Sequence, residues 1–517
     1  MKRTVCILLI LCCCTALSAQ QSMLDKYKAF QQSAKQDYTD FREAANARYA
    51  DFLRSSWELY QAYAPVTPPV EEEVPPVIYE EKKQEEKPVI EEQKPEPKPE
   101  PKPEDKPLVQ EEEREPIRHE APIPYRDVVI QPQPVPQPKP LAPVVENNSR
   151  TERTLTVSFY GTELSFRYPL RGFMLTDTGG DALAKAWMVL AGKDYDNLLY
   201  DCLAARDELS LCDWAYLKLL QQVCEGICGQ GDAAVFMQAF LYTQSGYQMR
   251  LARNAKGKLF LLIGSDFVFY DRPYFRLSGS RFFPLNKPED GTKEFSICPG
   301  KFDQEQPFSL LIPYEQQLTR EASAPRVHIS REGVKVQVSL NENLIRFYGD
   351  YPTGHYGDDI GTRWAMYANM PMEQSLRDSL YPVLRNALFG STEQEAVNIL
   401  LNWVQTGFVY EFDEKVWGGD RAFFPAETLY YPYCDCEDRS ILFSRLVRDL
   451  LDLDVVLLYY PGHLASAVAF SYPVGGDYLV YNDKHYTVCD PTYIGAPVGA
   501  TMPKMDNATA KIIPLQR

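Results

Sequence analysis

Two cysteines lie two positions apart in the stretch YYPYCDCEDRSILFSRLVRDLL, which runs from residue 430 to residue 451. Acidic residues surround them, and the apolar residues that follow recur at the spacing of one helical face. Cys436 therefore falls in the first turn of a predicted helix, where unpaired backbone N–H groups and the positive end of the helix dipole stabilise a thiolate. Metal binding, disulfide formation and nucleophilic catalysis are the three kinds of chemistry open to this pair.

Metal binding and a local disulfide are the weaker interpretations. A structural zinc site needs about four Cys or His ligands in paired clusters, and the sequence offers no second pair at finger-like spacing. We therefore expect no metal and no other cofactor. A disulfide between Cys434 and Cys436 would close an unusually tight ring. For Cys434 alone, burial and pairing with a distant cysteine both stay open.

A thiolate nucleophile works with an imidazole that accepts and returns its proton, and with a carboxylate that orients the ring. His463 lies in YYPGHLASAVAF, where a strand begins after a Pro-Gly turn, and Asp490 lies in YTVCDPTY at the end of another strand. The order is Cys, His, Asp, with 27 residues in each step. A helix N-terminus that packs across adjacent strands can bring the three together. His485, in NDKHYTV, is a second candidate for the base.

The stretch from about residue 393 to residue 503 resembles the transglutaminase-like (papain-like thiol) superfamily. The motifs that carry the resemblance are DCED before an apolar helix, YPGHLASAV and YTVCDPTY. The resemblance implies an α+β fold in which a helix packs on an antiparallel sheet. It also implies that Cys436 is the nucleophile, that His463 is the general base and acid, and that Asp490 orients the imidazole.

The same resemblance implies an oxyanion hole, usually formed by a backbone N–H of the nucleophile and one side-chain donor from upstream. Trp403, Trp417 and Tyr430 precede Cys436 and carry N–H or O–H groups. No spacing selects one of them. A place in the core or in the wall of the site is the alternative for each.

These residues predict an exported cysteine-dependent enzyme that transfers acyl groups from amide bonds. It would be a peptidase or amidase if water resolves the acyl-enzyme, and a transamidase if an amine does. Nothing in the sequence marks an amine-acceptor site, which favours hydrolysis. We expect a protein or peptide substrate, with cell-wall peptides among the candidates. The alternative is a non-catalytic envelope binding or assembly protein that keeps the fold.

The first part of the chain predicts a helix and a linker. Apolar and aromatic residues recur about every 3.6 positions over residues 22–63, which indicates a long amphipathic helix. This helix either docks on its own protein or binds an envelope partner. Residues 64–150 are rich in Pro, Glu and Lys, a composition that predicts a disordered linker in extended polyproline form.

From about residue 151 the composition becomes globular. We expect an α+β domain over residues 151–325, a strand-rich connecting segment over residues 326–372, and the catalytic domain over residues 373–517. The order helix, turn, strand, turn, strand occurs in GDAAVFMQAFLYTQSGYQMRLARNAKGKLFLLIG and again from CEDRS onward. One hypothesis for the earlier domain is an old duplication, in which this copy lacks the cysteine and the histidine.

Charge and the N-terminal residues indicate the setting. A net charge of −17 without a basic patch argues against a nucleic-acid partner. The start, MKRTVCILLILCCCTALSAQ, has two basic residues, an apolar run and small residues, which predicts a secretory signal peptide over residues 1–19 and a periplasmic or extracellular protein. The residues before Cys12 do not favour a lipoprotein anchor. No other stretch approaches the length of a membrane span.

Overall fold

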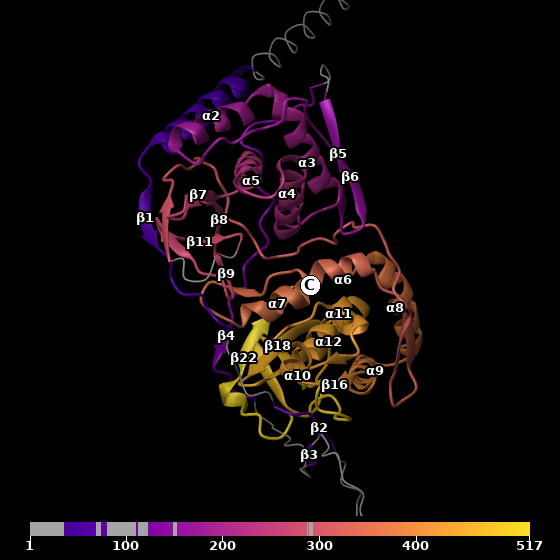
Figure 1. The fold of residues 1–517 in the computed structure, drawn as a ribbon. Coiled ribbons are helices and arrows are strands. Elements are labelled where there is room, and N and C mark those ends of the chain that lie inside the picture. Colours follow the sequence, from indigo (N-terminus) through magenta and orange to yellow (C-terminus); the bar gives the residue numbers. More distant parts are fainter. Residues whose placement is uncertain are drawn as a thin grey trace, which may run out of the picture.

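The computed structural model describes residues 36–68, 74–79, 110–111, 122–147, 152–286, 288 and 293–516. The predicted signal peptide lies outside this part, as does the first third of the predicted N-terminal helix. The described chain is a mixed α+β protein of two units, drawn one above the other in Figure 1. One hydrophobic core runs through both units. Strand β9 (Phe267–Phe269) also pairs with β15 (Gly354–Tyr356) across them.

The first unit is built on a sheet with the strand order β1-β12-β7-β8-β11-β10, in which all neighbours are antiparallel. Helix α5 packs across β7 and β8, and β8 is buried along its whole length because both of its faces are covered. The elements are β1 (Glu58–Gln61), β5 (Glu152–Phe159), β6 (Thr162–Pro169), α2 (Gly180–Leu190), η1 (Lys193–Tyr195), α3 (Asp196–Glu208), α4 (Asp213–Cys228), α5 (Asp232–Gln244), β7 (Met249–Arg253), β8 (Leu259–Ser265), β10 (Phe275–Leu277), β11 (Ser280–Pro284) and β12 (Glu294–Ile297).

The second unit is built on a sheet with the order β4-β22-β18-β19-β21-β20, antiparallel except for the parallel pair β4 and β22. Helix α12 packs across β18 and β19. The elements are β4 (Asp127–Val128), β13 (Arg326–Ile329), β14 (Lys335–Val338), α6 (Glu342–Gly349), α7 (Thr362–Asn369), α8 (Gln374–Ala387), α9 (Glu393–Thr406), β16 (Val409–Tyr410), α10 (Asp413–Trp417), α11 (Pro425–Tyr430), β17 (Tyr433–Cys434), α12 (Cys436–Leu451), β18 (Asp454–Tyr460), β19 (His463–Ala469), β20 (Tyr478–Tyr481), β21 (Lys484–Cys489), η2 (Asn507–Thr509) and β22 (Lys511–Pro514).

The two units share one topology. Strands β7, β8, β10, β11 and β12 correspond in chain order and in place to β18, β19, β20, β21 and β22. The outer strand of each sheet next to β12 or β22 comes from the N-terminal part of the chain, as β1 or β4. Each unit also has a leading hairpin, whose second strand packs on α3 or α8, and a central helix that packs on α4 or α9. The second unit differs by an insertion of residues 407–435 between α9 and α12, where only residues 229–231 separate α4 from α5.

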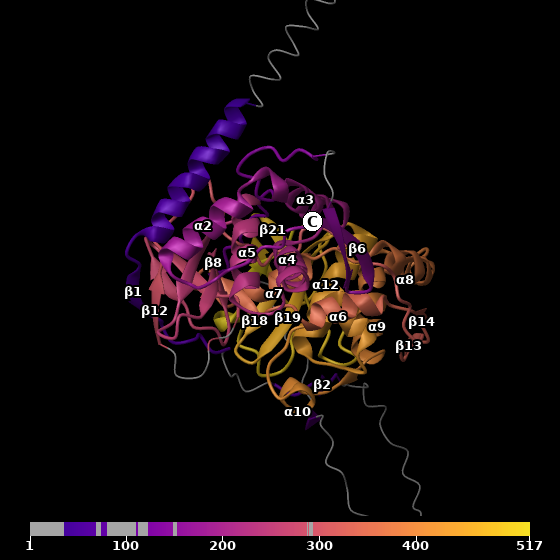
Figure 2. The same ribbon diagram turned by 45° about the horizontal axis from the view of Figure 1, so that its top comes forward.

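The N-terminal helix is shorter than predicted. It ends at residue 54 rather than near residue 63, because the chain then turns at Ser55 and continues as β1, which pairs with β12. The prediction failed because Tyr60 and Tyr63 match helical spacing but belong to the strand and to the bridge that follows it. Figure 2 shows the helix along the outer side of the first unit. Its Tyr49 is buried, whereas Tyr38 is half exposed.

The predicted linker is partly packed on the protein. Besides β4, the pair β2 (Val77–Ile78) and β3 (Gln110–Glu111) falls within it. Residues 131–140 are proline-rich and lie against the first unit, where a Cβ at Gly246 would stand 2.0 Å from the carbonyl oxygen of Lys139. Proline segments have few hydrogen-bond donors, but their carbonyl groups and side chains can still pack on a folded surface. Composition alone could not show this contact.

The predicted connecting segment, residues 326–372, is not mainly strands. It holds the hairpin β13–β14 and then the helices α6 and α7. It forms the leading part of the second unit, since β14 packs on α8 and α7 packs on α12. Helix α7 is nearly all buried and packs on α12, and tertiary packing therefore determines this short helix.

Candidate active site

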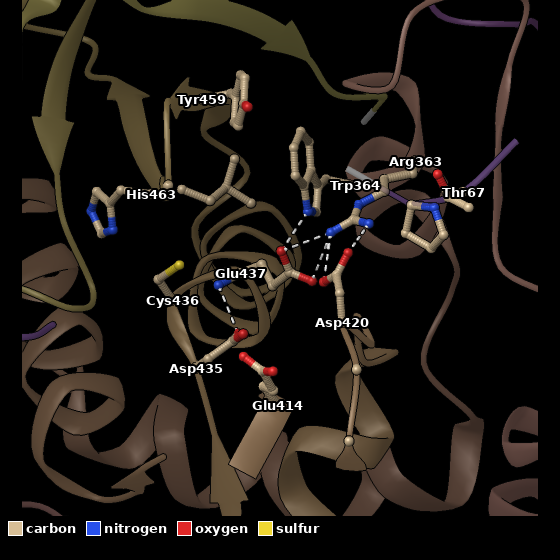
Figure 3. Close-up of a pocket in the computed structure, with 15 residues that line it drawn as sticks. Thr67, Arg363, Trp364, Glu414, Asp420, Asp435, Cys436, Glu437, Tyr459 and His463 are labelled. Atoms are coloured by element: carbon tan, nitrogen blue, oxygen red, sulfur yellow. Dashed lines mark hydrogen bonds and ion pairs between the residues drawn. The ribbon is translucent and has the colours of Figure 1, made fainter. Parts of the chain in front are cut away.

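A pocket of about 320 Å³ lies where the N-terminus of α12 meets the start of β19 (Figure 3). Its wall also includes α7, the loop after α10 and residues 67–68 of the N-terminal part. Four carboxylates line the pocket, from Glu414, Asp420, Asp435 and Glu437, together with the guanidinium of Arg363. The pocket therefore combines segments of both ends of the chain and of the insertion.

Cys436 is the first residue of α12, and the capping of that helix fixes its place. The carboxylate of Asp435 accepts hydrogen bonds from the backbone N–H groups of Glu437 at 3.0 Å and Asp438 at 3.2 Å. The Asp438 carboxylate in turn accepts the backbone N–H of Asp435 at 3.2 Å, which completes a capping box. Cys436 is only 5% exposed. The positive end of the helix dipole favours an anion at this position.

His463 is the first residue of β19 and follows a tight turn in which Gly462 has a φ of 75°. Its Nε2 lies 2.8 Å from Oδ2 of Asp490, and both side chains are buried. Its Nδ1 is buried and has no hydrogen-bond partner within the described residues. If the Nε2–H group donates a hydrogen bond to the carboxylate, Nδ1 carries the lone pair that can accept a proton from a thiol. Figure 3 shows the His463 ring and the Cys436 sulfur on the same side of the pocket.

Asp490 directly follows β21 and is held from several directions. Its Oδ1 accepts two backbone N–H groups of the next loop, at 2.8 and 3.2 Å, which leaves Oδ2 to face His463. Gln405 of α9 donates its side-chain N–H to the Asp490 carbonyl at 3.0 Å. Arg439 of α12 donates to the Gln405 carbonyl at 3.2 Å. These bonds connect the elements that carry the cysteine and the aspartate.

A buried charge network lies beside Cys436. Arg363 donates to both carboxylate oxygens of Asp420 and to Glu437, whose oxygens lie 3.2 and 3.3 Å from its Nη2. Trp364 donates its indole N–H to Glu437 at 2.8 Å. Burial raises the pKa of the Glu437 carboxyl well above its usual value, and the positive charge of Arg363 opposes that rise. The network ties α7 to the first turn of α12.

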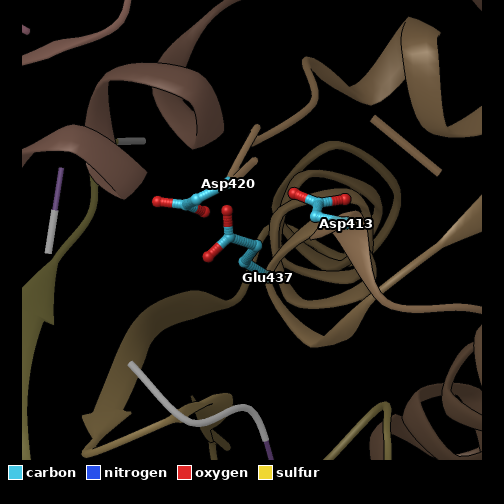
Figure 4. Close-up of side chains that lie close together, drawn as sticks. All are labelled: Asp413, Asp420 and Glu437. Carbon is cyan, nitrogen blue, oxygen red and sulfur yellow. The ribbon is translucent and has the colours of Figure 1, made fainter. Parts of the chain in front are cut away.

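Asp413, Asp420 and Glu437 bring one carboxylate oxygen each within 4.8 Å of one another (Figure 4). Such a cluster has the donor atoms that a divalent cation prefers. Two of the three carboxylates bind Arg363, and Oδ2 of Asp413 accepts the backbone N–H of Arg421 at 2.6 Å. A guanidinium of the protein itself therefore supplies positive charge here.

The predicted oxyanion donors do not line the pocket in the described structure. Trp403 is fully buried, with its ring packed edge-on against Phe408. Trp417 packs edge-on against an aromatic ring of the insertion, and Tyr430 lies under the guanidinium of Arg326. Aromatic packing accounts for all three positions, which favours the alternative of a place in the core or in a wall for each of them.

The structure places another tryptophan, Trp364, in the pocket. Sequence reasoning missed it because α7 is short and carries no motif beyond the adjacent Arg-Trp pair. The second candidate base, His485, is exposed in β21 and stacks on Tyr478, with ring centroids 4.9 Å apart. Cys434 is buried, and no disulfide links the cysteines of the described residues.

The shared topology allows the three positions to be located in the first unit. Cys436 and Asp232 are the first residues of the central helices α12 and α5. His463 and Leu259 are the first residues of β19 and β8, each of which is the second strand after its central helix. In each sheet, the residue three positions after Leu259 or His463 pairs with the last residue of β11 or β21. The residues that directly follow these two strands, Leu285 and Asp490, therefore occupy corresponding positions. In the first unit the Asp232 carboxylate accepts the backbone N–H of Leu259 at 2.9 Å.

No family model matches this chain, and the search of curated proteins finds no relative. Among the described residues, no helix combines the length and the apolar character that crossing a bilayer requires.

Proposed function

We propose that the protein is a cysteine-dependent acyl-transfer enzyme of the transglutaminase-like (papain-like thiol) superfamily, which acts after export on amide bonds of proteins or peptides. The observation that carries the proposal is the placement of Cys436, at a capped helix N-terminus and in one pocket with His463, whose far nitrogen binds the buried Asp490 carboxylate.

The chemistry follows from the protons that this arrangement can move. Nδ1 of His463 takes the thiol proton, and the Cys436 thiolate attacks the amide carbonyl carbon. The C–N bond then breaks as the imidazolium returns the proton to the leaving nitrogen, which leaves an acyl group on sulfur as a thioester. Water or an amine gives its proton to His463 and attacks the thioester. The C–S bond breaks, and the thiol receives the proton from the imidazolium.

Two features lower the barriers of these steps. Asp490 holds the imidazole ring and stabilises its positive charge when Nδ1 is protonated. The positive end of the α12 dipole lies at the pocket, where the negative charge on the carbonyl oxygen develops. The proposal leaves the acceptor as water or an amine.

The test is alkylation of Cys436 with iodoacetamide, followed by peptide mass spectrometry across a range of about pH 5 to 9. We expect fast labelling below pH 7, and slow labelling in His463→Ala because the thiolate then lacks its imidazolium partner. His485→Ala is the matched control and should label like the unmodified chain. Labelling no faster than that of an ordinary thiol would reject the proposal in favour of a binding or assembly protein. Cleavage of peptide amides that is lost in Cys436→Ala would establish the reaction itself.

A further inference from the structure

The walls of the pocket carry more negative than positive charge. Four carboxylates line it, from Glu414, Asp420, Asp435 and Glu437, and Arg363 is the only Lys or Arg side chain among the described residues of the wall. A cleft lined by one sign of charge concentrates the electric field and raises the local concentration of ions of the opposite sign. The pocket therefore favours a cationic ligand over an anionic one.

Three of the four carboxylates already have partners within the protein. Asp420 and Glu437 both accept hydrogen bonds from Nη2 of Arg363, at 2.9 and 3.2 Å. Asp435 accepts two backbone N–H groups at the start of α12, at 3.0 and 3.2 Å. The single guanidinium and the helix N-terminus therefore compensate these three groups.

Glu414 is the carboxylate that remains. It lies in α10, within the insertion, and is exposed. The adjacent Lys415 pairs with Glu411 instead. Among the described residues the Glu414 carboxylate has no hydrogen-bond or ion-pair partner, and Figure 3 shows it directed toward the first turn of α12 beside Asp435. Its charge is thus available to a ligand in the pocket.

Two other features of the wall indicate that a ligand fits here. The side chain of His463 is buried, and its Nδ1 has no hydrogen-bond partner within the described residues. Such a nitrogen is costly to bury unless a proton donor comes to it. Gly418 and Gly419 also line the pocket, and a Cβ added at either would meet no described atom within 4 Å. The backbone beside Glu414 therefore leaves room for a substrate side chain.

We propose that Glu414 selects peptide substrates that carry a basic side chain, lysine or arginine, close to the amide bond that Cys436 attacks. This inference rests on the proposed function, because it assigns a substrate class to the same site. The ammonium or guanidinium group binds the Glu414 carboxylate while the scissile carbonyl lies at the sulfur. Hydrogen bonds between two charged groups are about twice as strong as neutral ones.

The positive charge belongs to the peptide that is cleaved rather than to an amine that resolves the thioester. An amine attacks as the neutral free base. A nearby carboxylate favours the charged form of the amine and raises its pKa, so fewer molecules can attack. A lysine or arginine side chain of the substrate takes no part in the bond changes and stays charged throughout. Glu414 can therefore bind it without opposing the reaction.

The first experiment measures the charge near Cys436 without relying on catalysis. The full chain is labelled at about pH 7 with three methanethiosulfonates, which carry an ammonium group, no charge or a sulfonate group. Peptide mass spectrometry gives each rate at Cys436. Division by the rate of the neutral reagent removes differences in the reactivity of the thiol itself. The ammonium reagent should react faster than the sulfonate reagent, and added salt should reduce the difference.

The ratio of ammonium to sulfonate labelling should depend on Glu414. Glu414→Gln should lower it about three- to ten-fold, and Glu414→Lys about 10- to 100-fold, because the charge near the sulfur is removed or reversed. Glu163→Gln is the matched control: it removes the same charge from an exposed position on β6 of the first unit, outside the pocket wall, and should leave the ratio within about two-fold. A ratio that stays the same in both Glu414 variants, or that falls equally in Glu163→Gln, would overturn the proposal.

The second experiment tests the substrate class with peptides that carry lysine, norleucine or glutamate beside the scissile amide. The lysine peptide should exceed the norleucine peptide in kcat/KM by about ten-fold, mainly through a lower KM. This preference should disappear in Glu414→Gln and turn toward the glutamate peptide in Glu414→Lys. Equal kcat/KM for the three peptides in the unmodified chain would overturn the proposal. So would a rate that follows the charge of an added amine instead of the charge of the peptide.

The proposed function and the substrate assignment fail in different measurements. A Cys436 that labels like an ordinary thiol at every pH would reject the acyl transfer and, with it, the substrate. A labelling ratio that is independent of Glu414 would reject the substrate class alone, since the pH profile of alkylation does not depend on the charge of the reagent.

Discussion

The two units carry one scaffold with different residues at three corresponding positions. The second unit has Cys436, His463 and Asp490, and the first has Asp232, Leu259 and Leu285. In the first unit the carboxylate at the helix N-terminus accepts a hydrogen bond directly from the backbone of the neighbouring strand. In the second unit side chains with a thiol and an imidazole occupy these places. The scaffold positions the residues, and the residues determine whether chemistry is available.

The insertion adds a second difference between the units. Residues 407–435 supply Glu414, Asp420 and the glycines between them to the pocket wall. Gly418 has a φ of 74°, a backbone conformation that ends α10 and that L side chains adopt only with strain. In the first unit, α4 leads almost directly into α5, and no wall of this kind is built. The pocket thus depends on residues that the shared scaffold does not include.

Among the variants that test this comparison of the two units, Arg363→Leu should have the largest effect. It leaves the buried Glu437 and its neighbour Asp420 without their guanidinium, which should lower the free energy of unfolding by about 3–5 kcal/mol in urea denaturation. Adding Glu437→Gln should recover most of this loss. The matched variant in the first unit is Arg250→Leu, which breaks a buried pair with Glu305 at 2.7 Å.

Both arginine variants should lose stability, but only Arg363→Leu should also slow alkylation of Cys436, because only Arg363 connects to the first turn of α12. Equal labelling rates in the two variants would show that the charge network does not position Cys436.

A smaller effect, on the pH dependence of stability, should distinguish α4 from α9, the helices that pack on the two central helices. Burial raises the pKa of Asp213, the first residue of α4, to about 6, while Tyr247 and a backbone N–H donate to it. The folded state therefore holds this proton more tightly than the unfolded state. The resulting stability is complete below about pH 4 and is lost as pH rises through 6, by an amount on the order of 3 kcal/mol.

Asp213→Asn should remove this part of the pH dependence of the unfolding free energy, measured between about pH 4 and pH 8. Glu393→Gln is the matched control, since Glu393 begins α9 and binds Ser471 at the surface. A pH dependence that is unchanged in Asp213→Asn would contradict the assignment.

The smallest of the three effects concerns the carboxylate behind the imidazole. Asp490→Ala removes the carboxylate that binds Nε2 of His463 and orients its ring, and labelling of Cys436 at about pH 6 should fall about 10- to 100-fold. At the corresponding position, Leu285→Ala removes a buried apolar side chain and should lower stability by about 2–5 kcal/mol. It should leave the labelling rate unchanged. An Asp490→Ala chain with the unmodified pH profile would separate Asp490 from the reactivity of Cys436.

The relative placement of Cys436, His463 and Asp490 could be predicted from the sequence because each lies at an end of a strongly periodic element. Cys436 begins an apolar helix, His463 begins a strand after a Pro-Gly turn, and Asp490 directly follows a strand. Their separation along the chain is short enough for one helix and one hairpin to bring them together. The helix-then-hairpin order of the earlier domain could be predicted for the same reason, since α5 and β8 are mainly apolar.

The remaining parts of the pocket come from segments whose local sequence does not indicate their place. Arg363 and Trp364 lie on a helix of eight residues that only tertiary packing stabilises. Thr67 and Pro68 lie in proline-rich sequence whose composition predicts exposure, but the backbone bond between Asp271 and Val66 holds this segment on the folded protein. Trp403 carried the right chemical group, but its place on the inner face of α9 puts it in the core. Long-range packing determines these positions.

The pairing of β1 with β12 and of β4 with β22 has a consequence for proteolysis and truncation. Each of these short strands covers the hydrogen-bonding groups of a neighbour that would otherwise face solvent. A chain that begins at residue 152 would therefore present two unpaired sheet edges, one in each unit. Such edges recruit strands from other molecules, so removal of the N-terminal part would give the chain a tendency to self-associate.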